Sequence, residues 1–169
     1  PEGIWRSPYN GDKWVMSQGE DQNRRALYTY WKRTAPYPTM ITFDGGAREV
    51  CVTRRIRTNT PLQALTSLND STYFVMARNF AFKMQELDTK DVNNQIRKGY
   101  EHMMFKPITE TKLNALLELY TKSLGTFTKN EKATIDIIGE KDTQPKPETA
   151  ALVVVASAML NLDEWVNKN

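Results

Sequence analysis

Apolar residues recur at intervals of three or four along residues 71–124, the spacing that places side chains on one face of an α-helix. Three segments carry such a stripe: 71–87, a segment between Thr89 and Pro107, and a segment that ends near Gly125. The stripes are Tyr73, Ala77, Phe80, Met84 and Leu87; Val92, Ile96, Tyr100 and Met103; and Leu113, Leu116, Leu117, Tyr120 and Leu124. An apolar face must be buried against another element, so the pattern predicts three helices that pack together, the last two as an antiparallel pair.

Polar residues and prolines indicate where other helices begin. The segment TPLQ at 60–63 combines an N-cap Thr, a first-turn Pro and the Gln of a capping box, which predicts a helix over about 61–68. A shorter helix is expected over about 130–138, ended by Gly139. Pro147 opens a last helix whose segment 152–160 is apolar on nearly all sides, so this helix is expected at the centre of the bundle.

Residues 1–59 show a different pattern, rich in prolines and glycines and holding three of the four tryptophans. Ser17 and Glu20 resemble a capping box and predict one helix over about 20–33, which ends before Pro36. Residues 36–59 are expected to be loop with little regular structure. The whole pattern predicts a mainly α fold: a single domain over 1–169, with a long loop-rich N-terminal segment at 1–59 and an irregular helical bundle at 60–169.

Composition narrows the possible functions. The chain has 169 residues and 25% charged residues, which is ordinary for one globular domain. Its net charge of +3 comes from the N-terminal third and is too sparse for a nucleic-acid binder. No apolar run is long enough to span a bilayer, so we expect no membrane span. The chain starts without a Met, which suggests a piece of a larger protein.

The chain holds one cysteine, Cys51, and one histidine, His102. These are too few for a closed zinc site or for covalent haem attachment, so no metal site and no cofactor are expected. Cys51 is expected to be a buried structural thiol. Neither a nucleophile elbow nor a Gly-rich phosphate loop is present. The sequence therefore identifies no catalytic residue and leaves enzymatic activity open.

A polar cluster just before residue 61 is the candidate ligand-binding site. Its members are Asp44, Arg48, Glu49, Arg54, Arg55, Arg57, Asn59 and Gln63. Guanidinium groups and a helix N-terminus bind carboxylate and sulfate, which would suit an anionic polysaccharide. Nearby aromatic residues offer rings on which sugars stack, although most of them are expected to pack beneath the loops. They are Trp5, Tyr9, Trp14, Tyr28, Tyr30 and Trp31. The preferred alternative is that the arginines pair with nearby acids and carbonyls and hold the loop in place.

Four stretches carry a family resemblance: YTYWKRTAPYPTMITFD at 28–44, REVC at 48–51, RTNTPLQALTSLND at 57–70 and LNLDEW at 160–165. Together they resemble the planctomycete-type domain of unknown function number fifteen fifty-three. The resemblance implies a domain near the C-terminus of large exported proteins, often behind a planctomycete cytochrome c domain, in the periplasm or at the cell surface. It supplies no catalytic residues.

The sequence leaves three functions open. The preferred one is a non-catalytic accessory module that packs on upstream domains of a parent protein. The others are a binding module for an anionic or sugar polymer, and part of an enzyme site completed by an upstream domain. A large exposed apolar patch would favour packing on a parent domain, and a polar cleft lined by Trp and Arg would favour ligand binding.

Overall fold

The computed structural model describes residues 17–31, 36–46, 51, 53–54, 58–139 and 146–166. The chain divides into two compact units, Pro1–Thr58 and Asn59–Asn169. Within the described ranges all regular structure is helical, which confirms the predicted mainly α fold with a helical bundle. That the two units make up a single domain stays a prediction.

The described part of the first unit contains three short helices. Two are 3-10 helices, η1 (Gly19–Asn23) and η2 (Ala26–Tyr28), and the third is α1 (Pro38–Thr42). The single helix predicted over 20–33 is wrong. Gly19 has a φ of 63°, Arg24 is extended, and the N-cap of η1 is Gln18, whose side chain makes no capping bond, so a continuous helix cannot form. The segment 36–59 was expected to be loop, yet Pro38 begins α1 as a first-turn proline.

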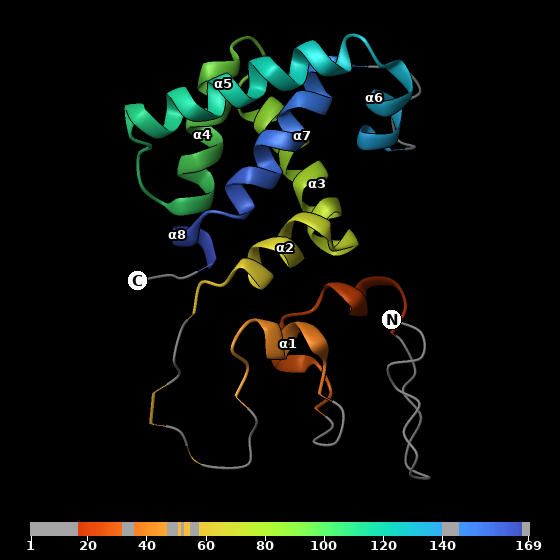
Figure 1. Cartoon of the computed structure of the whole chain (residues 1–169), viewed down its shortest axis with the longest axis vertical. Coiled ribbons are helices and arrows are strands. Elements are labelled where there is room, and N and C mark those ends of the chain that lie inside the picture. The colour runs from red at the N-terminus through yellow and green to blue at the C-terminus, as the bar shows by residue number, and fades with distance from the viewer. Residues whose placement is uncertain are drawn as a thin grey trace. The chain divides into compact units, whose positions relative to one another are not determined.

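The second unit contains seven helices within its described residues (Figure 1). They are α2 (Pro61–Asn69), α3 (Ser71–Leu87), α4 (Val92–Met104), α5 (Glu110–Phe127), α6 (Glu131–Ile138), α7 (Pro147–Leu160) and α8 (Asp163–Val166). All helices predicted from residue 60 onward are present. The stop predicted at Gly125 is wrong because α5 continues through it to Phe127, whereas Gly139 does end α6, with a φ of 85°.

Helix α7 is the centre of the second unit, as its apolar sequence predicts. Nine of its 14 residues are buried, and α3, α5 and α6 pack around it (Figure 1). The stripes predicted for the other helices supply the rest of the core, including Ala77, Ile96 and Leu113. Helix α4 approaches α3 closely at Gly99, where an added Cβ would lie 2.7 Å from Cγ of Met84. The core is therefore built from the predicted helix faces.

The sequence also led to expectations about membrane spans and about Cys51. No described helix has the length and the apolarity needed to cross a membrane. Cys51 is exposed, so its expected role as a buried thiol is wrong. The reason is its position: the described residues of the first unit contribute nothing to the buried core, which comes from α3 onward.

Candidate functional site

Helix α2 buries polar side chains and exposes apolar ones, the reverse of the usual arrangement. Its two buried side chains are polar, Gln63 and Ser67, while Leu62, Leu65 and Leu68 are 60%, 59% and 48% exposed. These leucines follow one another at intervals of three residues and so share one side of the helix. An isolated exposed leucine is ordinary, but three on one side of a nine-residue helix form an apolar face that the described residues of the second unit leave exposed.

The buried side of α2 is polar because its residues complete the start of the helix. The backbone N–H of Thr60 donates to Oε1 of Gln63, and the N–H of Gln63 donates to Oγ1 of Thr60, so the predicted capping box is formed. The hydroxyl of Ser67 donates to the carbonyl of Gln63. These bonds allow polar side chains to be buried, and they fix which side of α2 faces outward.

The next helix extends the exposed apolar residues. Val75 and Met76 on α3 are 48% and 43% exposed, although α2 and α3 pack against each other and α3 buries Ala77 against α7. We call Leu62, Leu65, Leu68, Val75 and Met76 together the α2–α3 surface. Exposed apolar side chains on two helices that are in contact favour packing on another protein domain.

Asn59, a predicted site residue, has a structural role at the start of the second unit. Its side-chain amide donates to Oδ1 of Asp163, the first residue of α8, over 2.8 Å. Both side chains are exposed. The bond therefore links the segment in front of α2 to the C-terminal helix.

The other predicted site residues are described only in part. The carboxylate of Asp44, in the first unit, accepts bonds of 2.8 Å from both the backbone N–H and the hydroxyl of Thr58. Arg54 is exposed. Four members of the cluster lie outside the described residues: Arg48, Glu49, Arg55 and Arg57. The grouping of the cluster into one ligand-binding site stays a prediction.

A second polar group, which sequence reasoning missed, is centred on Glu164. Its carboxylate pairs with the ammonium groups of Lys106 at 2.8 Å and Lys112 at 2.7 Å, and it accepts a bond of 2.5 Å from the hydroxyl of Tyr100. These three donors, Lys106 first, hold the pKa of Glu164 at about 2. Burial, followed by the bond to Glu164, raises the pKa of Tyr100. All these groups are partnered, so the cluster fastens α8 to α4 and the start of α5.

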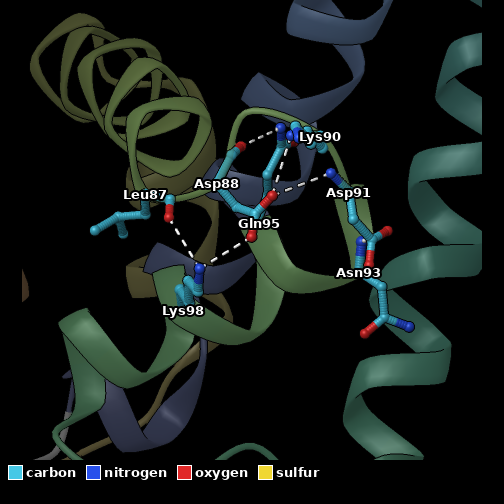
Figure 2. Close-up of polar contacts among 7 residues, drawn as sticks. All are labelled: Leu87, Asp88, Lys90, Asp91, Asn93, Gln95 and Lys98. Atoms are coloured by element: carbon cyan, nitrogen blue, oxygen red, sulfur yellow. Dashed lines mark hydrogen bonds and ion pairs between the residues drawn. The ribbon is translucent and has the colours of Figure 1, made fainter.

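The connection between α3 and α4 is held by a third polar group (Figure 2). Oδ1 of Asp88 accepts from the backbone N–H groups of Lys90 and Asp91, and its Oδ2 accepts from Nζ of Lys98 at 2.9 Å. The same ammonium donates to the carbonyl of Leu87. The bond from Lys98, followed by those from the two backbone groups, lowers the pKa of Asp88 to about 2. The bonds close the turn and leave this carboxylate no proton to exchange near neutral pH.

An open hollow of about 460 Å³ lies beside Arg78 and is lined also by Ile135, Asp136 and Gly139. Arg78 uses its Nε and Nη2 to bind the carbonyls of Ile137 and Asp136, at 2.6 and 2.9 Å, and lies 4.8 Å from the centre of the Phe74 ring. The guanidinium thus closes the C-terminal end of α6. No Trp is among the lining residues that the structure describes, so the described part of the hollow is not the Trp- and Arg-lined cleft that would favour sugar binding.

The described residues contain no cluster of metal-binding side chains. No group of three or more His, Cys, Asp or Glu side chains there could hold a metal ion. His102 lies exposed on α4, away from the buried core. The carboxylates of Asp88 and Glu164 are each paired with lysines.

Comparison with known proteins gives one match. Residues 3–120 match the family PSD1, described as "Protein of unknown function (DUF1553)". No curated protein and no solved structure matches the chain. The matched range includes the first three of the four stretches that carry the predicted resemblance and ends before LNLDEW at 160–165.

Proposed function

The chain belongs to the PSD1 family of proteins of unknown function (DUF1553), and from that premise we propose that it is a non-catalytic accessory helical module of a larger exported protein. The module packs through the α2–α3 surface on a neighbouring domain of that protein. Its place in the periplasm or at the cell surface follows from the resemblance to planctomycete-type exported proteins and is part of the proposal.

The observation that carries the proposal is the reversed polarity of α2. A helix that served only the core of the second unit would turn its leucines inward and its Gln and Ser outward. Here the capping box and the Ser67 bond hold Gln63 and Ser67 inside, so the leucines stay exposed. Each apolar Å² that a partner covers contributes roughly 25 cal/mol, which makes cover of this face favourable.

The proposal is tested by comparing the accessibility of α2 in the isolated chain and in the full-length protein encoded by the gene. Leu65→Cys is introduced together with Cys51→Ser, and the rate of labelling by a maleimide is measured for both proteins. We expect rapid labelling in the isolated chain and labelling slowed at least about tenfold in the full-length protein, since a docked domain would exclude the reagent.

The matched control is Asn114→Cys on α5, an exposed position on a different helix. This cysteine should react at the same rate in both proteins. Equal rates for Leu65→Cys in the two proteins would refute the proposal, and so would a gene that encodes no further domain.

A further inference from the structure

Helix α8 depends on polar side chains for its place in the second unit. None of its four residues is buried, although Trp165 packs partly against the core. A helix of this length is too short to be stable by itself. The bonds that Asp163 and Glu164 make to other elements therefore decide whether α8 stays where it is.

One carboxylate makes three of these bonds. Glu164 accepts from the hydroxyl of Tyr100 on α4, pairs with Lys106 in the connection between α4 and α5, and pairs with Lys112 on α5. Because a single side chain joins these three elements to α8, its departure breaks all three bonds together.

The neighbouring carboxylate extends the attachment to the start of the second unit. Asp163 accepts from the side-chain amide of Asn59, which is the first residue of this unit and directly precedes Thr60, the N-cap of α2. Asp163 and Glu164 are adjacent in a helix of one turn, so neither can leave its partners while the other stays in place. Release of α8 thus also frees Asn59.

Release of α8 requires little disruption of the rest of the second unit. The buried core is formed by α3, α4, α5 and α7 and includes no residue of α8. Segments that bury little apolar surface and are held by bonds near the surface open more readily than the whole protein unfolds. Opening of α8 is therefore expected while the core helices stay packed.

We propose that α8 is a latch, which opens and closes as one unit on the folded second unit. In the closed state Glu164 and Asp163 hold the core and the start of α2 together. In the open state Asn59 is released, and with it the start of α2, where the second unit continues from the preceding chain. This inference does not depend on what packs against the α2–α3 surface.

Amide hydrogen exchange of the parent chain tests the latch at both of its ends. The N–H groups of Trp165 and Val166 donate to the carbonyl of Leu162, and those of Thr60 and Gln63 form the bonds of the capping box. These four amides should show similar protection and little dependence on low concentrations of urea, because opening of α8 exposes little surface. Amides of α7 should be better protected and should depend steeply on urea, since they exchange when the whole unit unfolds.

A charge reversal should open the latch. Glu164→Lys places a third ammonium group beside Lys106 and Lys112, so the protection of the four amides should fall together by at least about tenfold, while amides of α7 stay protected. The matched control is Glu118→Lys, which makes the same change of charge beside Lys122 on the open surface of α5. It should leave the four amides unchanged.

Two results would overturn the inference. If Glu164→Lys exposes the amides of Trp165 and Val166 but leaves those of Thr60 and Gln63 protected, the start of α2 does not depend on α8. If the four amides of the parent chain follow the urea dependence of α7, then α8 opens only when the whole unit unfolds and is no latch. The second measurement needs no variant, so it decides the matter even where Glu164→Lys fails to fold.

Discussion

The side-chain amide of Asn59 donates a hydrogen bond of 2.8 Å to the carboxylate of Asp163, across 104 positions of the sequence. Asn59 stands directly before Thr60, the N-cap of α2, and Asp163 is the first residue of α8. Glu164, the neighbour of Asp163, is in turn fastened to α4 and to α5 through Tyr100 and Lys112. The start of the helix that bears the exposed leucines is thus tied to the core through the last helix.

Exchange of the two groups tests this link. Asn59→Asp places two carboxylates within hydrogen-bond distance, so we expect a lower melting temperature than in the parent chain, by the few degrees that correspond to about 1 kcal/mol. The double variant Asn59→Asp with Asp163→Asn restores a donor and an acceptor in reversed order and should recover most of the loss. Thermal melts of the parent chain and of the two variants measure it, and a double variant no more stable than Asn59→Asp alone would show that the bond contributes nothing.

The ion pairs of Glu164 predict a specific pH dependence. The pKa of Glu164 is lowered to about 2 from an ordinary value near 4.5, so the folded state favours the ionised carboxylate. The stabilisation is complete above about pH 4.5 and is lost as the pH falls toward 2. Glu164→Gln should therefore lower the free energy of unfolding at pH 7 by about 1–2 kcal/mol, since water partly screens the half-exposed lysines.

The same measurement at low pH supplies the check on this prediction. Urea denaturation of the parent chain and of Glu164→Gln should converge as the pH is lowered from 4.5 to about 2. The matched control is Glu118→Gln, because Glu118 pairs with Lys122 on the open surface of α5 and that substitution should leave the urea midpoint unchanged. A constant difference between Glu164→Gln and the parent chain over this range would mean that the effect is not electrostatic.

The helices of the second unit could be predicted because their signals are local. The capping box of Thr60 and Gln63 and the first-turn prolines act within one turn, so each fixes a helix start whatever the rest of the chain does. The helix predictions failed where two local signals compete. The left-handed backbone of Gly19 prevents the capping box that was predicted at Ser17. Gly125 stays helical because the helix packs on α7 along its length.

The candidate site could be predicted less well because its contacts are distant in sequence. Glu164 meets Tyr100 and Lys112 across 64 and 52 positions, and no spacing rule signals such a pair. The stretch LNLDEW, which holds Glu164, stands out in the sequence only through the family resemblance. The leucines of α2 form a stripe, but a stripe does not tell whether it faces the core of its own chain or that of a partner. Only the burial of Gln63 and Ser67 shows which side is turned inward.

Because α2 buries polar side chains and exposes leucines, we expect substitution of a polar residue to destabilise the chain more than substitution of a leucine. Gln63→Ala removes a buried side chain that completes the capping box, and it should lower the free energy of unfolding by about 1–2 kcal/mol. Leu65→Ala removes a side chain that is 59% exposed and should cost less than about 0.5 kcal/mol in the isolated chain. Chemical denaturation of both variants measures the difference. A larger loss from Leu65→Ala would mean that the leucine face is covered within the chain itself.

Phe105 has both a strained backbone and an apolar side chain that is exposed to water. It follows the end of α4 with a φ of 57°, in the left-handed region that costs a residue with a Cβ about 1 kcal/mol. Its side chain is 87% exposed, so it buries little in return. Its N–H donates to the carbonyl of Glu101, and a glycine keeps this bond. Phe105→Gly should therefore raise the melting temperature by a few degrees.

The control for this prediction is the corresponding residue after α5. Thr128 also follows a helix end and donates its N–H to a carbonyl four residues back, that of Leu124, but its φ of −61° and ψ of −28° are right-handed. Glycine has no strain to relieve there and adds freedom to the unfolded chain, so Thr128→Gly should lower the melting temperature. Opposite signs for the two substitutions identify backbone strain as the cause. A fall for Phe105→Gly as well would mean that the lost ring contacts and the added freedom of the unfolded chain outweigh the strain of the backbone.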